Sequence, residues 1–237
     1  MNIDKINMAI ERMRAFLPYN GYYVAFSGGK DSQVVLDLAR RANIPHDAHY
    51  SVTTVDPPEL MAFIRRHYPD VHWERPSMSM FRLIVHHGAP PTARFRYCCR
   101  ELKETGGYGR FVLTGIRAQE SPRRAQRGMV EPCRDRRKDY LHPIIDWTEQ
   151  DVWAYHAYYN LPHVSLYDEG RRRVGCVMCP LASKSQRHHD ALRWPTFATM
   201  YRRACNAAYA ANPNSRWKSG DEMYNWWLGI GNSSDLD

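Results

Sequence analysis

The residues best suited to chemistry form a short glycine-containing segment near the start of the chain and two close pairs of cysteines. The segment reads Ser27-Gly28-Gly29-Lys30-Asp31-Ser32. Glycines let a backbone approach its ligand closely, and successive N–H groups at the start of a helix bind phosphate. Lys30 adds a positive charge. The pattern therefore predicts a phosphate site made by Ser27, Gly28, Gly29, Lys30, Asp31 and Ser32.

This segment differs from the Walker A loop of P-loop NTPases. That pattern would place its first glycine at position 24, where the chain has Val24, and it would have Ser or Thr where Asp31 follows the lysine. The alternative is an ordinary glycine turn on the surface. The apolar run before the segment and the helical pattern after it favour the phosphate site.

The cysteine pairs are Cys98-Cys99 and Cys176-Val177-Met178-Cys179. The C-x-x-C spacing lets two thiolates share one metal centre, and Pro180 follows it as proline often follows cluster cysteines. Three interpretations compete: a four-thiolate iron–sulfur cluster, a structural Zn²⁺ site, and a redox dithiol beside an unrelated pair. The adjacent pair is unusual for zinc. We therefore expect Cys98, Cys99, Cys176 and Cys179 to hold a cluster, with Zn²⁺ as the other candidate.

Composition limits the class of protein. The chain has 237 residues, 43% of them hydrophobic, which suits one globular domain. Lys and Arg number 33 against 25 Asp and Glu, a net charge of +8, so an anionic ligand or partner is expected. No apolar run reaches the ~18–20 residues that cross a bilayer. We expect a cytoplasmic protein with no membrane partner, whose six cysteines are thiols or metal ligands.

The elements that must position these residues alternate between strands and helices. Apolar runs at 22–26, 49–55, 71–73 and 111–114 predict strands, and the spacing of Val35, Leu38, Ala39 and Ala42 predicts a helix after the glycine segment. This alternation predicts an α/β fold with a doubly wound parallel sheet. Helical signals then dominate, beginning with a capping box at Thr148–Asp151. We expect a nucleotide-binding α/β part over 1–145 and a helical carboxy-terminal region over 146–237, packed as one compact domain.

Three further candidates follow predicted strands, at the edge where ligands collect in parallel sheets. Gly115 and Arg117 come just after the run at 111–114, and Asp56 follows the run at 49–55. Gly115 would allow a nucleotide to approach, Arg117 would contact phosphate, and Asp56 would position Mg²⁺ or ribose. The ordinary alternatives are a strand-to-loop turn, a solvated arginine and a charge at a helix start.

Basic side chains cluster beyond these positions. They are Arg123, Arg124, Arg127, Arg134, Arg136, Arg137, Lys138 and Arg171–Arg173. Such runs are commonly solvated surface, but here they are also suited to nucleic acid or a sulfated nucleotide. Glu120 and Ser121, like Asp56, are left open between a role in the site and an ordinary structural one.

The Ser27–Ser32 segment resembles the loop of the PP-loop ATP pyrophosphatases. The resemblance implies an adenine nucleotide alpha-hydrolase-like fold and cleavage of ATP between its α- and β-phosphates. Ser27, Gly28, Gly29, Asp31 and Ser32 would cradle the β/γ-phosphates with help from Lys30. Mg²⁺ is expected to neutralise the leaving pyrophosphate.

Several motifs in order resemble the phosphoadenosine phosphosulfate (PAPS) reductase family over residues 20–185. They are Tyr97–Lys103, Thr114–Ser121 with Arg123-Arg124, Pro143–Thr148, Asp151–Trp153 and Leu166–Gly170 before Gly175-Cys176. In cluster-bearing members, a Cys-Cys pair and a later C-x-x-C hold a [4Fe–4S] centre, which the resemblance implies for Cys98, Cys99, Cys176 and Cys179.

Two departures from assimilatory reductases point to an ATP-using branch. Those enzymes end in a Glu-Cys-Gly-Leu-His-type segment, whereas no cysteine here follows Cys205. Their loop is also modified, whereas this one keeps the full Ser-Gly-Gly-Lys-Asp-Ser form. The chain is thus similar to sulfate adenylyltransferase small subunits and to the cluster-bearing ATP-pyrophosphatase components of DNA phosphorothioation systems.

We therefore expect an ATP pyrophosphatase that activates an acceptor for sulfur transfer, with Lys30, Asp31 and Arg117 catalytic. ATP, Mg²⁺ and a [4Fe–4S] cluster are the expected cofactors. A cysteine desulfurase or thiol carrier would donate sulfur, and nucleic acid is a candidate acceptor. One alternative is a thiol-dependent PAPS or APS (adenosine 5′-phosphosulfate) reductase using Cys133, Cys205 or a partner's thiol. Another is a non-catalytic module that binds nucleotide or nucleic acid.

Overall fold

The computed structural model describes residues 2–133, 137–213 and 216–230. Arg134 and Arg136 of the basic run, and the side chain of Cys133, lie outside the described part. The chain forms two compact units, each assembled from separate stretches of sequence. The first comprises Met1–Ser51, Pro58–Glu74 and Thr105–Val174, and the second Val52–Pro57, Arg75–Glu104 and Gly175–Asp237. The predicted division into 1–145 and 146–237 stays a prediction.

The first unit is built on a six-stranded sheet with the order β3-β2-β1-β4-β6-β5. Its strands are β1 (Tyr22–Ala25), β2 (His46–Ser51), β3 (His72–Glu74), β4 (Phe111–Leu113), β5 (Val130–Cys133) and β6 (Lys138–Leu141). All neighbouring pairs are parallel except β5 with β6. The α/β class with a doubly wound, mainly parallel sheet is confirmed. The hairpin of β5 and β6 was not predicted, because these short strands carry charged residues and Pro132 in place of an apolar run.

The strand order places a switch point between β1 and β4. From β1 the chain adds β2 and then β3 on one side, whereas β4 pairs with the other side of β1. The loops that leave the carboxyl ends of β1 and β4 therefore diverge. In open α/β sheets this crevice is where ligands bind.

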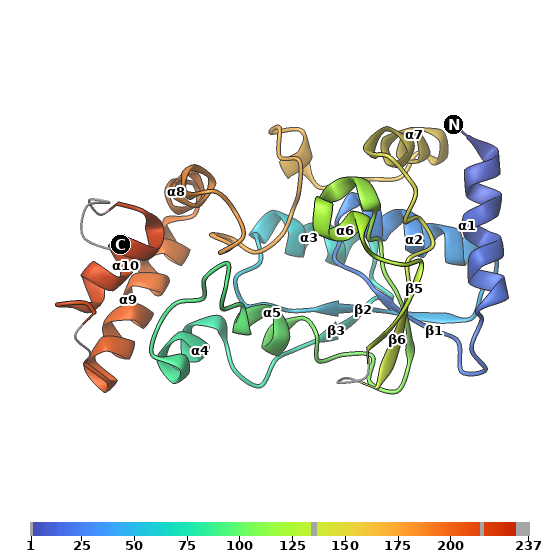
Figure 1. Ribbon diagram of the computed structural model, residues 1–237. Coiled ribbons are helices and arrows are strands. Elements are labelled where there is room, and N and C mark those ends of the chain that lie inside the picture. The colour runs from blue at the N-terminus through green and yellow to red at the C-terminus, as the bar shows by residue number, and fades with distance from the viewer. Residues whose placement is uncertain (1, 134–136, 214–215, 231–237) are drawn as a thin grey trace. The chain divides into compact units, whose positions relative to one another are not determined.

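Helices α1 (Ile3–Ala15), α2 (Lys30–Arg41), α3 (Pro58–His67) and α7 (Glu149–Tyr159) lie on one side of the sheet (Figure 1). Helix α2 buries Val35, Leu38 and Ala39 of the predicted apolar stripe, together with Val34 and Leu36, whereas Ala42 is its C-cap residue. Helix α7 begins at the predicted capping box of Thr148 and Asp151. Short segments complete the unit: η1 (Ala118–Glu120), α6 (Pro122–Ala125) and η3 (Ser165–Tyr167).

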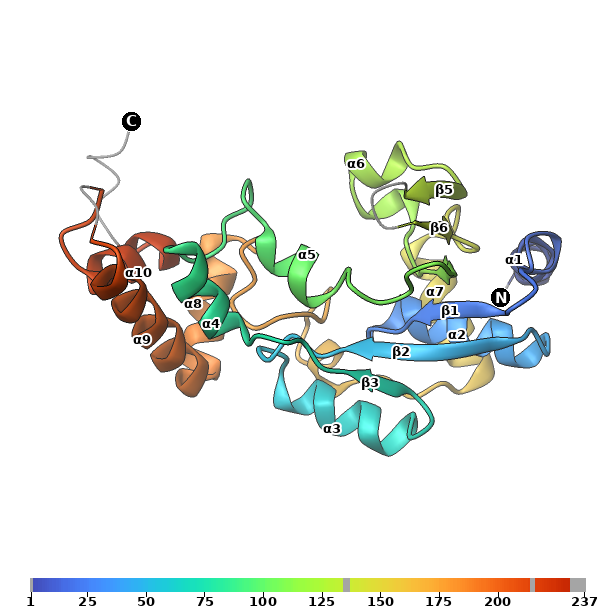
Figure 2. The same ribbon diagram turned by 90° about the horizontal axis from the view of Figure 1, so that it is seen from below.

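The second unit is helical. It contains α4 (Met80–His87), α5 (Tyr97–Leu102), α8 (Lys184–Arg193), α9 (Pro195–Ala211) and α10 (Gly220–Leu228), with α4, α8 and α10 around α9 (Figure 2). The ring of Tyr201 lies 4.7 Å from that of Trp227 and 5.3 Å from that of Phe81. The aromatic residues of this region thus form part of the unit's core. No described helix is both long and apolar enough to cross a membrane.

Candidate functional site

The Ser27–Ser32 loop joins β1 to the first turn of α2. Gly28 has a φ of +71°, and a Cβ there would lie 2.7 Å from Leu60 Cδ1 and 2.8 Å from Ile64 Cδ1. Glycine is therefore required by both backbone conformation and space. Gly29 is the N-cap residue of α2 and has no side chain with which to cap the helix. The N-cap residue therefore leaves the first-turn N–H groups of α2 uncapped, as an anion site needs, although Lys30 N donates to the hydroxyl of Tyr167 at 3.0 Å.

The two serines of the loop face each other. Ser27 Oγ and Ser32 Oγ are 3.1 Å apart, and Ser32 Oγ donates to Gly29 O at 2.9 Å. Gln33 Nε2 donates to Gly28 O at 2.9 Å, and Tyr68 Oη donates to Gln33 Oε1 at 2.8 Å. The turn is therefore held in one shape before any ligand arrives.

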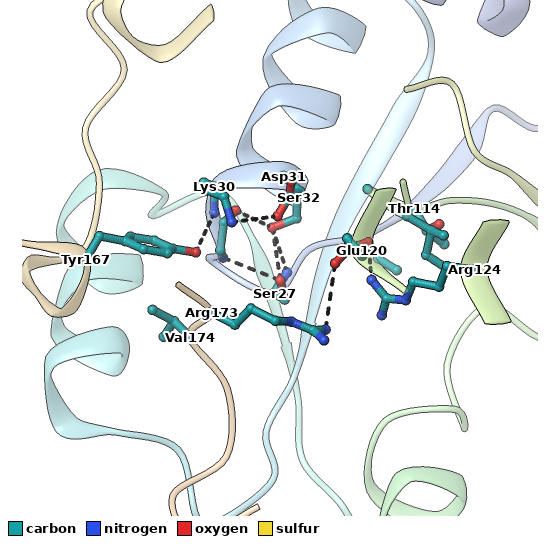
Figure 3. Close-up of a pocket in the computed structure, with 14 residues that line it drawn as sticks. Ser27, Lys30, Asp31, Ser32, Thr114, Glu120, Arg124, Tyr167, Arg173 and Val174 are labelled. Atoms are coloured by element: carbon teal, nitrogen blue, oxygen red, sulfur yellow. Dashed lines mark hydrogen bonds and ion pairs between the residues drawn. The ribbon is translucent and has the colours of Figure 1, made fainter. Parts of the chain in front are cut away.

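A cavity of about 200 Å³ opens beside this loop (Figure 3). A water molecule takes about 30 Å³ in the liquid, so the cavity has room for several waters or for phosphate groups. Its lining comes from the β1–α2 loop, the loop after β4, η1, α6 and η3. The lining residues are Ala25, Ser27, Gly29, Lys30, Asp31, Ser32, Thr114, Gly115, Ile116, Glu120, Arg124, Tyr167, Arg173 and Val174.

Gly115 allows the loop after β4 to approach the loop after β1. A Cβ at this position would lie 2.7 Å from Asp31 C, 2.8 Å from Asp31 O and 2.9 Å from Ser32 N. These neighbours are backbone atoms, which cannot rotate away. The close approach at Gly115 is thus between the loop after β4 and the first turn of α2, and it shapes one wall of the cavity.

Two cations hold the Asp31 carboxylate. Arg117 Nε donates to Asp31 Oδ1 at 2.6 Å, and Lys30 Nζ lies 3.5 Å from Asp31 Oδ2. Arg117 is only 3% exposed and is not among the residues that line the cavity. The structure therefore places Arg117 behind Asp31, where it fixes the carboxylate.

Lys30 is also buried, at 2% exposure. Its Nζ donates to Arg172 O at 3.0 Å and lies 3.6 Å from Glu149 Oε1. The lysine therefore links the loop to the 171–173 segment and to the start of α7.

Glu120 contributes a carboxylate to the same cavity. It accepts a hydrogen bond from Arg117 N at 3.0 Å, pairs with Arg124, and has one oxygen 3.8 Å from Arg173 Nη2. The sequence places Arg124 and Arg173 only in basic runs, and it leaves the role of Glu120 open. Tyr167 was noted only inside a motif, and nothing in its local sequence identifies it as a cavity residue.

Asp56 is not part of this cavity. It belongs to the second unit, where its carboxylate accepts hydrogen bonds from Thr53 N at 2.8 Å and Thr53 Oγ1 at 2.7 Å. The structure thus gives Asp56 a role in the turn after β2. Of the other candidates, it brings Gly115 together with residues of the glycine segment at the cavity.

The four candidate cysteines all belong to the second unit. Cys98 and Cys99 lie in α5, and Cys176 Sγ donates to Thr53 Oγ1 at 3.5 Å. A hydrogen bond from Cys98 lowers the pKa of Cys99 to about 6. That same hydrogen bond, followed by burial and by the thiols of Cys99, Cys176 and Cys179, raises the pKa of Cys98. All four thiols are therefore close enough to interact electrostatically.

Lys103 lies near these thiols, and the negative charge of Cys176 is the largest of the influences that raise the pKa of Lys103. Four thiols without a carboxylate form the donor set of a zinc or iron–sulfur site. Within the described residues, however, no group of three or more His, Cys, Asp or Glu side chains is placed to hold a metal ion. The four thiols suit zinc or an iron–sulfur cluster by their chemistry, but the described side chains are not positioned as a formed site for a single metal ion.

Comparison with known proteins reveals relatives along most of the chain. An adenosine 5′-phosphosulfate reductase of Halalkalibacterium halodurans is 25% identical over 82% of this chain and 92% of that enzyme. An uncharacterized 37.8 kDa protein of Escherichia phage 186 is 35% identical over 48% of this chain. The match spans 38% of the phage protein's length.

Solved structures share the fold. A Candida auris PAPS reductase in a phosphate complex has a TM-score of 0.55 at 19% identity, covering 74% of this chain and 96% of that one. A Candida glabrata FMN adenylyltransferase in complex with ATP has a TM-score of 0.52 at 18% identity, covering 74% and 61%. The model of the phosphoadenosine phosphosulfate reductase domain matches residues 21–182. This chain, with its glycine loop at the switch point of a parallel sheet, therefore belongs to the phosphoadenosine phosphosulfate reductase domain family.

Proposed function

We propose that this protein is an ATP pyrophosphatase that activates an acceptor for sulfur transfer. The observation that carries the proposal is the pair of hydroxyls of Ser27 and Ser32, 3.1 Å apart at the start of α2, whose N-cap residue is Gly29. They stand beside a cavity that Arg124 and Arg173 also line. Hydroxyls, free amides and guanidinium groups together bind the oxygens of a pyrophosphate.

The reaction is a displacement at the α-phosphorus of ATP. An acceptor oxygen attacks this phosphorus, the bond to the bridging β-oxygen breaks, and pyrophosphate leaves with that electron pair. A sulfur nucleophile then attacks the activated atom of the acceptor, the bond from that atom to the AMP oxygen breaks, and AMP leaves with that electron pair. Hydrosulfide leaves a thiol on the acceptor directly, whereas a persulfide carrier does so after a second thiol reduces the disulfide that the attack forms. The residues of the cavity would hold the pyrophosphate oxygens and stabilise the negative charge that develops on the leaving group.

Asp31 and Glu120 are the carboxylates of the cavity. Mg²⁺ is usually held by one or two carboxylates together with substrate phosphates, so these two residues suit it. When bound, Mg²⁺ would neutralise charge on the leaving pyrophosphate. Arg117 and Lys30 keep the Asp31 carboxylate in place for this purpose.

We further propose that Cys98, Cys99, Cys176 and Cys179 are the ligands of a [4Fe–4S] cluster, with Zn²⁺ as the other occupant. The support is the electrostatic coupling of all four thiols within one unit. A cluster would supply electrons or bind sulfur. Nucleic acid, as in DNA phosphorothioation, is our candidate acceptor, supported by the net charge of +8.

A second candidate function is reduction of adenosine 5′-phosphosulfate or its 3′-phosphorylated form to sulfite. It is favoured by the H. halodurans reductase, which matches 82% of this chain at 25% identity. The two functions differ in their products. ATP cleavage gives AMP and pyrophosphate, whereas reduction gives sulfite.

The test incubates anaerobically prepared protein with Mg-ATP and, separately, with each sulfated nucleotide plus a thiol. Sulfide and duplex DNA are added to parallel ATP reactions as sulfur source and acceptor. We expect AMP and pyrophosphate from ATP, lost in Ser32→Ala and kept in Ser185→Ala, a change at an exposed serine of α8. ADP and phosphate, or sulfite without ATP cleavage, would contradict the pyrophosphatase.

A further inference from the structure

Tyr167 reaches the phosphate cavity from a distant part of the chain. It is the last residue of η3, and its hydroxyl accepts a hydrogen bond from Lys30 N at 3.0 Å (Figure 3). Lys30 is the first residue of α2, so this amide is one of the helix N–H groups that otherwise bind an anion. The hydroxyl thus lies at the start of α2, on the wall of the cavity.

The proton of the Tyr167 hydroxyl is free to donate a hydrogen bond. A tyrosine hydroxyl has one proton to donate and two lone pairs to accept with. The bond from Lys30 N uses a lone pair, and within the described residues no protein atom accepts the Tyr167 proton. The proton is therefore available to a group that enters the cavity.

The ring of Tyr167 is held on several sides. The indole of Trp153 meets it edge-on at 5.2 Å, and Lys30 Nζ lies 5.4 Å from its centroid. The hydroxyl also comes close to Gly29, where a Cβ would lie 3.3 Å from it. Burial raises the pKa of Tyr167 to about 12, so the hydroxyl keeps its proton at neutral pH. A protonated, fixed hydroxyl at a helix N-terminus is a preorganised donor to an anion.

We propose that Tyr167 Oη donates a hydrogen bond to a phosphate oxygen of the ligand while it accepts one from Lys30 N. Tyr167 is then a phosphate-binding residue, and it extends the electropositive start of α2 into the cavity. The inference rests on the proposed use of this cavity for the phosphates of ATP.

Two other roles of Tyr167 would have different consequences for phosphate binding. If the hydroxyl only blocks the Lys30 amide, a bound phosphate must displace it, and removing the hydroxyl should tighten phosphate binding. If Tyr167 only packs against Trp153, removing the hydroxyl should leave phosphate binding unchanged. The sign of the effect therefore separates the three roles.

The experiment measures binding of inorganic pyrophosphate by calorimetry to the unmodified protein, to Tyr167→Phe and to Tyr158→Phe. Phenylalanine keeps the ring and removes the hydroxyl. Tyr158 is 60% exposed on α7 and serves as the matched control. We expect about tenfold weaker binding for Tyr167→Phe, as for the loss of one hydrogen bond to a charged group. Tyr158→Phe should bind as the unmodified protein does, and thermal unfolding should confirm that both variants are folded.

Equal or tighter binding by Tyr167→Phe would overturn the assignment of Tyr167 and leave the proposed function standing. A lack of pyrophosphate binding by the unmodified protein would overturn both, since the cavity would then not be a phosphate site. The two failures are thus distinguishable.

Discussion

Arg117 Nε donates a hydrogen bond to Asp31 Oδ1 at 2.6 Å, which ties the segment after β4 to the first turn of α2. Arg117 is almost fully buried, and Asp31 is its charge partner. A buried guanidinium without such a partner is costly. Arg117 therefore holds Asp31 in place, and its predicted contact with phosphate stays a prediction.

Replacing Asp31 by Asn should destabilise the protein through this arginine. The variant keeps the size of the side chain and removes the negative charge, so the guanidinium of Arg117 loses its counter-ion. We expect the free energy of unfolding to fall by about 1–3 kcal/mol. Urea titration measures this. Asp70→Asn, which removes an exposed ion pair with Arg40, should cost about 0–1 kcal/mol. Equal losses in the two variants would contradict the argument.

Replacing Gly115 by Ala should damage both stability and ligand binding. The new methyl group would lie within 2.9 Å of three backbone atoms of Asp31 and Ser32, so the two loops must separate. Overpacking of this kind costs about 1–3 kcal/mol. We expect a lower melting temperature together with weaker pyrophosphate binding.

Gly175→Ala is the matched control for that change. A Cβ at Gly175 meets no atom within 4 Å, so its melting temperature and pyrophosphate affinity should remain unchanged. If Gly115→Ala behaves like Gly175→Ala, the close approach of the two loops is not needed for the site.

Acidification should destabilise the protein through His156. Its Nε2 is 2.9 Å from Lys30 O, and the side chain is buried. Burial is the main influence that lowers the pKa of His156 below its ordinary value of 6.5. A depressed folded-state pKa means that the unfolded chain takes up the proton first, so stability is present above pH ~6.5 and is lost as the pH falls through the folded-state pKa.

Urea titrations at several values between pH 7.5 and pH 5 measure this loss. His156→Gln should have a shallower pH dependence than the unmodified protein. Some dependence should persist, because burial also lowers the pKa of His142. Parallel curves for the two proteins would rule out a contribution from His156.

Iron content tests the four-thiol site. If Cys98, Cys99, Cys176 and Cys179 hold a [4Fe–4S] cluster, anaerobically prepared protein should contain about four iron atoms per chain. Cys99→Ser and Cys176→Ser should each lose most of this iron. Cys205→Ser should keep it, since burial in α9 raises the pKa of that thiol to about 12 and leaves it a poor ligand. Stoichiometric zinc in place of iron would favour the alternative occupant.

Local patterns in the sequence predict most of the elements that carry the site. The apolar run before Ser27 and the helical spacing after Ser32 predict β1 and α2, and both elements form there. Thr148 and Asp151 predict the start of α7. These predictions are correct because periodicity, capping and glycine conformations act over a few residues.

The sequence alone therefore determined the glycine loop, the strand and helix on either side of it, and the pairing of cysteines along the chain. Tertiary structure alone decided that Tyr167 meets Lys30 across 137 positions and that Arg117 meets Asp31 across 86. It also decided that Asp56 serves the turn with Thr53 and not the cavity. The reason is physical: contacts between residues so far apart along the chain depend on how the strands, helices and loops pack, and no local preference of the chain encodes them.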